Sequence, residues 1–345
     1  DLPAYVDNVA DIAIDRLPDF ELAPGQCARI PTGGFLPPGA DAVVMVEYAE
    51  AVDGSDSGPA EIEVRKSVAP GENAMLRGED AAKGDAVLRA GQRLRPQELG
   101  LLAALGVTQV PVHRRVRAGL FSTGDELVPA AESPGPGRIR DVNSHTVAAI
   151  LASAGVDTTA YGIVRDDLDA LTATLERAVA ENDAALLSGG SSVGVRDLTV
   201  AAIQALGGTI LAHGVALSPG KPTILGDVGG TPVLGLPGQA TSVQVVVHVL
   251  GAPFLAHLAG DARAFDAAAR PRILAEAASN MPSRQGREDF VRVALEHRDC
   301  APPLARPLYG RSGLLKTLVA AHGLLRIPAE SEGAYKGDTA WVWLV

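Results

Sequence analysis

The feature that most constrains the fold is an alternation of strand-like and helix-like segments from residue 116 to a helix-like run that begins at Leu198. Short apolar runs in this region are typical of buried strands, and apolar residues at helical spacing, such as Val147, Ile150 and Leu151, stand between them. This alternation predicts a doubly wound α/β domain with a parallel sheet, in which ligands bind outside the carboxyl ends of the strands. The segments are 116–121, 143–154, 158–164, 168–180, 184–187 and a helix from Leu198.

A loop rich in glycine and serine follows the third strand-like segment. It reads Ser188-Gly189-Gly190-Ser191-Ser192-Val193-Gly194 and ends near Asp197. Glycines allow phosphate oxygens to approach free backbone N–H groups, and the start of the next helix favours an anion. The serines offer hydroxyls, and Asp197 could hold a metal that bridges the phosphates. The loop favours a phosphate site, although Gly-Gly-Ser runs also form ordinary turns between a strand and a helix.

Acidic residues follow the carboxyl ends of three predicted strands. Asp125 and Glu126 follow the first, Asp166 and Asp167 the second, and Asp197 the third. Five acids at one edge would repel one another unless they share a cation, so the pattern predicts Mg²⁺ with a phosphate-bearing ligand. The alternative for Asp166 and Asp167 is that they cap the helix that follows them.

Two further loops belong to the same half of the domain. Ser218-Pro219-Gly220-Lys221-Pro222 precedes a short predicted strand, and Leu236-Pro237-Gly238 leads into a long apolar helix that ends near Leu258. Lys221 supplies the cation that an anion site needs. The loop is not a Walker P-loop, because Gly214 is one residue too far upstream and Pro222 stands where Ser or Thr would bind Mg²⁺.

In this order and spacing, the motifs resemble those of the MoeA family of molybdopterin molybdenumtransferases, which also includes the gephyrin E domain. The C-terminal run Arg287-Glu288-Asp289-Phe290-Val291-Arg292 is similar to the arginine-rich strand motif of the family. The resemblance therefore covers nearly the whole chain. The other matching segments are 29–34, 37–44, 77–80, 121–127, 188–194, 219–222 and 236–238.

The resemblance implies a transferase. Such an enzyme binds adenylylated molybdopterin, Mg²⁺ and molybdate, cleaves the phosphoanhydride with release of AMP, and inserts the metal into the dithiolene. It implies a homodimer, with a MogA-type molybdopterin adenylyltransferase and molybdoenzyme acceptors as further partners.

The resemblance also implies roles for individual residues. The catalytic residues would be Thr32, Asp80, Asp166, Asp197 and Lys221, and the metal ligands Asp125, Glu126 and Asp197. Part of the acidic side would come from the other subunit of the dimer, whereas Lys221, Pro222, Ser242, Arg287, Arg292 and Ser312 would lie near the oxyanion pocket. The substrate-binding residues would be Ser122, Thr123, Gly124, Asp125, Glu126, Ser188, Gly189, Gly190, Ser191, Gly194, Pro219, Gly220, Pro222, Pro237, Gly238, Ser242, Arg287, Arg292 and Ser312.

Turn signals and the resemblance together divide the chain into four expected parts. Residues 1–77 are expected to form a β-rich domain and 78–111 part of an elongated dimerisation domain. Residues 112–260 would be the MogA-like α/β molybdopterin-binding domain and 261–345 a C-terminal β domain. The family carries a Ser-x-Met-Asp-Gly-Tyr-Ala segment upstream of this region, and its Asp has no counterpart in this sequence.

Two departures from the family pattern keep other functions open. Ser218 stands where the family often has Lys, and Gln239-Ala240 replaces Asn-Pro, so a preference for tungstate is one hypothesis. An adenylyltransferase is a second, but single-domain enzymes of that kind lack the flanking β modules. A non-catalytic pterin-binding scaffold is a third, which the four retained acids disfavour, namely Asp80, Asp125, Asp166 and Asp197.

Composition excludes several classes of protein. A net charge of −11 argues against a nucleic-acid surface, and it requires local cations to attract anionic substrates. No uninterrupted apolar stretch approaches the roughly 18 residues of a membrane span. Cys27 and Cys300 suggest neither a disulfide framework nor a zinc site, so we expect a cytoplasmic enzyme with no membrane partner.

Overall fold

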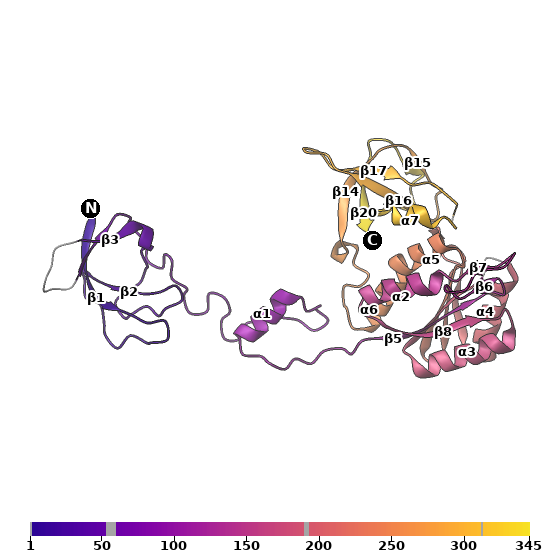
Figure 1. Ribbon diagram of the computed structural model, residues 1–345, viewed down its shortest axis with the longest axis horizontal. Helices are drawn as coiled ribbons and strands as arrows, with labels where there is room; N and C mark the ends of the chain where they lie inside the picture. Colours follow the sequence, from indigo (N-terminus) through magenta and orange to yellow (C-terminus); the bar gives the residue numbers. More distant parts are fainter. Residues whose placement is uncertain (1, 53–59, 190–192, 312) are drawn as a thin grey trace. The chain divides into compact units, whose positions relative to one another are not determined.

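The computed structural model describes residues 2–52, 60–189, 193–311 and 313–345, and for 193–197 it describes the backbone only. The chain forms two compact units, Asp1–Arg89 and Ala90–Val345. Each unit has its own sheets (Figure 1).

The N-terminal unit is built around a four-stranded sheet. Its elements are β1 (Ala4–Asp11), β2 (Gln26–Arg29), η1 (Val46–Tyr48), β3 (Ala49–Ala51) and β4 (Ala60–Val64). The strand order is β2-β1-β4-β3, with β1 parallel to β2 and antiparallel to β4. Along β1, half-buried and exposed residues alternate, as in a strand with one face toward the interior. The β-rich character predicted for this region is therefore observed.

The second unit contains a six-stranded sheet in the order β10-β12-β13-β9-β5-β8. Its strands are β5 (Arg117–Thr123), β8 (Asp157–Val164), β9 (Ala184–Ser188), β10 (Thr209–His213), β12 (Ile224–Val228) and β13 (Thr231–Leu236), with the small pair β6 (Leu127–Val128) and β7 (Ile139–Arg140) beside it. The neighbours β13, β9, β5 and β8 are parallel, as the sequence predicts.

One edge of this sheet differs from the prediction of a parallel sheet. β12 runs antiparallel to both of its neighbours. The reason is the connection Gly229-Gly230 between β12 and β13, in which both glycines have positive φ angles of 61° and 89°. A turn this short can join only antiparallel strands.

Helices cover both faces of the sheet, as the doubly wound prediction requires (Figure 1). They are α2 (Asn143–Ser153), α3 (Leu168–Glu181), α4 (Val193–Ala205), α5 (Ala240–Val246), η2 (Val247–Gly251) and α6 (Ala252–Leu258), and α1 (Pro96–Ala104) precedes them. α2, α5 and α6 pack on the face that Leu120 shares, whereas α3 and α4 pack on the face of Phe121. α4 begins five residues before the predicted Leu198, so Asp197 lies within the helix.

α5, η2 and α6 form one continuous apolar helix with a π-helical middle. Among the described residues, only this helix is long and apolar enough to suit a membrane span. However, 56% of its apolar window is buried inside the protein, and Val243, Val247 and Leu255 have no exposed surface. The helix therefore forms part of the core of the α/β domain.

The C-terminal domain is a small barrel. Its elements are η3 (Ala267–Ala269), β14 (Arg272–Ala277), β15 (Met281–Pro282), β16 (Glu288–Glu296), β17 (Leu304–Pro307), α7 (Leu315–Val319), β18 (Gly323–Ile327), β19 (Gly333–Ala334) and β20 (Thr339–Leu344). The strands β16, β17, β14, β20 and β18 pair in that order, and β18 pairs again with β16, which closes the ring. This agrees with the β domain expected at the C-terminus.

A strand pairing and an arginine are among the contacts that hold the barrel against the α/β domain. β11 (Leu217–Ser218), from the loop before β12, pairs in parallel with Glu288 and Asp289 of β16. Arg270 donates to the carbonyls of His248 (3.5 Å) and Val249 (3.2 Å) in η2, and its guanidinium lies 4.4 Å from the ring centre of Trp343. The π-helical segment and the barrel thus share one arginine.

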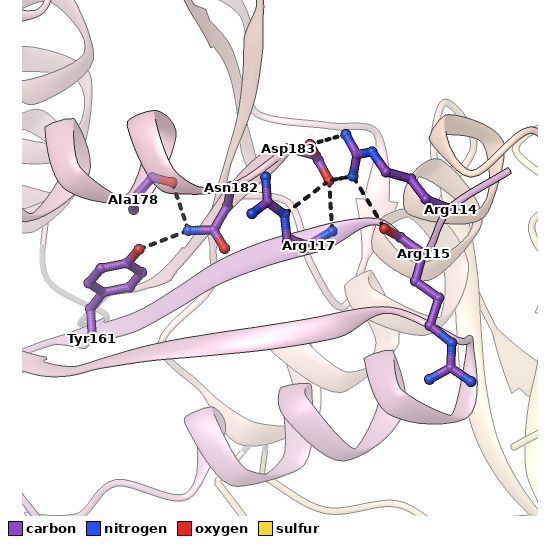
Figure 2. A network of polar contacts seen from close by, with 7 residues as sticks. All are labelled: Arg114, Arg115, Arg117, Tyr161, Ala178, Asn182 and Asp183. Atoms are coloured by element: carbon purple, nitrogen blue, oxygen red, sulfur yellow. Dashed lines mark hydrogen bonds and ion pairs between the residues drawn. The ribbon is translucent and has the colours of Figure 1, made fainter.

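Asp183 lies just before β9 and holds the chain at the amino ends of β9 and β5 (Figure 2). Its carboxylate accepts two hydrogen bonds from the Arg114 guanidinium, at 2.5 and 2.6 Å, and one from the backbone N–H of Arg117 at 2.8 Å. The hydrogen bond from Arg114 is the main cause that lowers the pKa of Asp183 to about 2. Asp183 therefore fixes the chain where it enters β5.

We predict that Asp183→Asn lowers the free energy of unfolding by about 1 kcal/mol, a small value because solvent screens the mostly exposed Arg114. The folded pKa of about 2 lies below the ordinary aspartate pKa of 3.8, so this contribution is present above pH 4 and is lost as the pH falls toward 2. Urea unfolding at several pH values measures it. Asp157→Asn is the matched control, because Asp157 meets Arg115 at 3.5 Å with both side chains mostly exposed. Equal effects of the two substitutions at pH 7 would contradict the assignment.

Candidate functional site

The predicted ligand loops lie along one edge of the sheet. Because β13, β9, β5 and β8 are neighbours and parallel, the loops after them meet at the same edge. The structure thus brings together segments that are far apart in sequence. The described parts of these loops are 124–126 after β5, 165–167 after β8, Gly189 after β9, and 237–239 after β13.

Buried hydroxyls line this edge on the side of α2. Ser122 and Ser188 are register partners in β5 and β9 and are 1% and 2% exposed. Ser122 Oγ has no hydrogen-bond partner within the part of the chain that the structure describes. An unsatisfied buried hydroxyl is uncommon, and a bound ligand or water is its usual partner. This favours a polar ligand here.

Asp141 and Asn143 join the same edge, and the sequence reasoning missed both. Asn143 donates to Ser188 Oγ and to the carbonyl of Gly238, each at 2.8 Å. Asp141 accepts from the N–H groups of Asn143 (3.1 Å) and Ser144 (3.2 Å) at the start of α2. The signal available in the sequence was Asp141-Val142-Asn143 directly before a helix, which alone indicates an ordinary cap.

The acids of the edge fall into two groups. Asp166 accepts a hydrogen bond from the Thr123 hydroxyl at 2.6 Å, and its N–H donates to Asp125 Oδ1 at 3.4 Å. Asp167 instead accepts from the N–H of Ala170 at 2.9 Å and caps α3, so the capping alternative is confirmed for this residue. Within the described residues, no three Asp, Glu, His or Cys side chains form a group that could hold a metal. The side chain of Asp197 lies outside that part.

Lys221 lies in a turn whose backbone conformation requires a glycine at the preceding position. Gly220 has a φ of 135°, and a Cβ on it would lie 2.5 Å from a methyl carbon of Val246, so only glycine fits. The Val215 N–H donates to the Lys221 carbonyl at 2.9 Å, and the Thr223 hydroxyl donates to the Gly220 carbonyl at 2.7 Å. The Lys221 side chain is exposed, and with Pro222, His213 and Gly214 it lines a cavity of about 380 Å³.

Arg292 lies at the junction of the α/β domain and the barrel. It donates to the hydroxyls of Thr241 in α5 (3.1 Å) and Thr317 in α7 (2.6 Å), and to the carbonyl of Gly310 (3.3 Å). No carboxylate among the described residues pairs with it, and burial lowers the pKa of its guanidinium. A half-buried cation without a counterion favours an anionic ligand.

Arg287 has a different environment. Its Nε lies 3.0 Å from Oδ1 of Asp289, which is 6% exposed and also accepts a hydrogen bond from the Ser283 hydroxyl at 2.7 Å. The charge of Arg287 is therefore balanced locally, whereas those of Lys221 and Arg292 are not. This distinction was not foreseen from the sequence.

The remaining predicted residues are distributed as follows. Ser242 is buried in the first turn of α5, and Pro237 and Gly238 lie directly before this helix. Thr32 and Asp80 are exposed residues of the N-terminal unit. Gly190, Ser191 and Ser312 lie outside the described residues. Gly194 lies in α4, and only its backbone is described.

Comparison with known proteins defines the class first. Residues 119–257 match the family described as a probable molybdopterin binding domain. Residues 3–106 match the MoeA N-terminal region (domain I and II), and residues 275–345 match the MoeA C-terminal region (domain IV). Three consecutive matches cover most of the chain, so this is a multidomain protein with a central molybdopterin-binding type of domain.

Individual relatives agree along nearly the whole length. A putative molybdopterin biosynthesis protein of Methanocaldococcus jannaschii is 34% identical over 94% of this chain and 77% of its own. A molybdopterin molybdenumtransferase of Bacillus subtilis is 30% identical over 99% and 78%. The solved MoeA protein of Pyrococcus horikoshii, at 33% identity, superimposes with a TM-score of 0.73 over 99% of this chain and 81% of that one. The chain belongs to the MoeA family.

We predict opposite effects of substituting the two arginines. Arg292→Gln should weaken molybdate binding about tenfold or more with little loss of stability, because it removes a cation that no protein carboxylate balances. Arg287→Gln should change binding less but lower the free energy of unfolding by about 1–3 kcal/mol, because it leaves Asp289 buried without its counterion. Calorimetric titration and urea unfolding measure the two quantities. The reverse order of effects would contradict the charge assignment.

Proposed function

We propose that the protein is a molybdopterin molybdenumtransferase of molybdenum cofactor biosynthesis. Its substrates would be adenylylated molybdopterin and molybdate, and its products AMP and the metal-loaded cofactor. Full-length similarity to MoeA proteins supports this, and one observation carries it. Lys221 and Arg292, which pair with no carboxylate in the described part of the chain, lie in elements that the β11–β16 pairing ties together.

The two cations would bind the oxyanion. Lys221 lies three residues after β11, and Arg292 lies in β16, so both are fixed by the same pair of strands. Arg292 also touches Thr241, next to Ser242 at the start of α5. Cations together with hydroxyl donors are the groups that bind tetrahedral oxyanions, with Ser312 and Arg287 as further members of the pocket.

The loops after β5, β9 and β13 would hold the pterin and its pyrophosphate. Asp125, Glu126 and Asp197 supply only oxygen ligands, the kind that Mg²⁺ prefers, and no described basic side chain neutralises Asp125. We propose that these three residues would hold a Mg²⁺ ion, with Asp197 completing a set of which Asp125 and Glu126 lie in the described part of the chain. When bound, it would neutralise the charge of the phosphate oxygens during release of AMP. Asp166, held by the Thr123 hydroxyl, would orient this edge.

The finer assignments complete the proposal. The protein would act as a homodimer in the cytoplasm, and the acidic side of the site, which includes Thr32 and Asp80, would come partly from the other subunit. The expected domains are 1–77, 78–111, 112–260 and 261–345. A MogA-type adenylyltransferase would supply the substrate, and apo-molybdoenzymes would receive the product. Ser218 and Gln239-Ala240 lie in the oxyanion and pterin loops, so tungstate is the alternative metal.

The test is release of AMP from adenylylated molybdopterin by the full chain with Mg²⁺, adding molybdate or tungstate separately. We expect release to be stimulated by one oxyanion, which names the metal.

Lys221→Ala should weaken oxyanion binding by about tenfold or more while affinity for the pterin stays the same, because Lys221 is one of two cations proposed for the oxyanion. Lys336→Ala, in the barrel, is the matched control. Absence of release with either oxyanion would favour a pterin-binding scaffold.

A further inference from the structure

Asn143 makes contacts that none of the roles above explains. Its side chain is 8% exposed at the first position of α2. The amide nitrogen carries two hydrogens and has two acceptors, Ser188 Oγ and the Gly238 carbonyl, each at 2.8 Å. Both donors are therefore used within the protein.

The two acceptors lie at, or just after, the carboxyl ends of two different strands. Ser188 is the last residue of β9, directly before the glycine loop, and Gly238 lies between β13 and α5. β9 and β13 are neighbours, and Ser188 is paired in register with Leu236, two residues before Gly238. Ser188 Oγ also lies 3.4 Å from the carbonyl of Pro237. Asn143 thus bridges the points where two adjacent strands open into loops.

The bridge is itself held in place. Asp141, which is 5% exposed, accepts hydrogen bonds from the N–H groups of Asn143 and Ser144. The N–H of Asp141 donates to the carbonyl of Val128 in β6 at 2.9 Å. The start of α2 is therefore fixed to β6, and the amide of Asn143 needs no rearrangement before it donates.

We propose that Asn143 is a positioning residue that keeps the end of β9 at Ser188 and the Pro-Gly loop after β13 at the separation that adenylylated molybdopterin requires. This inference rests on the proposed function, since it takes the pterin pyrophosphate as the ligand of those loops. Asn143 acts through Ser188 and Gly238 and need not touch the substrate.

The chemistry requires an amide at this position. An aspartate has the same shape but offers only acceptors at neutral pH, so one oxygen would face the Gly238 carbonyl without a hydrogen between them. Asn143 Oδ1 has no hydrogen-bond partner in the described part of the chain, so the protein holds this side chain through its donors. Replacing the amide by a carboxylate therefore removes the bridge while the volume stays nearly the same.

The experiment compares Asn143→Ala and Asn143→Asp in the full chain. Titration gives the Kd of each for adenylylated molybdopterin and for molybdate. We expect both variants to bind adenylylated molybdopterin about tenfold or more weakly, because a misplaced loop loses several contacts at once. The Kd for molybdate should stay within about twofold, because Asn143 contacts neither Lys221 nor Arg292. Ser153→Ala, which removes an exposed hydroxyl from the same helix, is the matched control.

A double-mutant cycle separates positioning from general stabilisation. With Ser188→Ala already present, Asn143→Ala should cost less pterin affinity than it does alone, because the two residues share one contact. Wild-type pterin affinity in Asn143→Asp would overturn the proposal. So would equal losses for pterin and molybdate with a lowered melting temperature. If the wild-type chain binds adenylylated molybdopterin but releases no AMP, the proposed function fails while the Kd comparison still decides the role of Asn143.

Discussion

The rest of the site depends on the interface between the barrel and the α/β domain. β11 adds to the barrel through β16, and Arg270 joins η2 to Trp343. Trp343 packs on Phe290, which lies in a small apolar cluster with Val245 of α5. Because the same strand β16 carries Arg292, this interface fixes the position of the Arg292 guanidinium relative to the loops of the α/β domain. Disruption of this interface would leave two intact domains without a common anion site.

The α/β domain could be predicted closely where periodicity is strong. The predicted helices 143–154 and 168–180 differ by one residue from α2 and α3, because their apolar residues keep a regular helical spacing. The direction of β12 could not be predicted, since it depends on how Gly229-Gly230 turns the chain. The start of α4 was predicted too late, at Leu198, because the five helical residues before it lack the apolar spacing that predicts a helix.

Side-chain partners were the least predictable part of the site. Asp141 and Asn143 look like a helix cap in the sequence, and only burial and the contact with Gly238, 95 residues away, show a wider role. Arg287 and Arg292 look equivalent on one strand, but Asp289 balances only the first. Such differences depend on which groups share a desolvated environment, and local sequence patterns carry no information on this.

The most direct measurement is the position of a bound oxyanion. Crystals of the full chain soaked in tungstate, with anomalous data collected at the tungsten absorption edge, locate the metal independently of any activity. We predict a tungsten peak contacted by Lys221 and Arg292, beside the start of α5. A peak found only at other residues would contradict the account, because Lys221 and Arg292 would then serve some purpose other than binding the oxyanion.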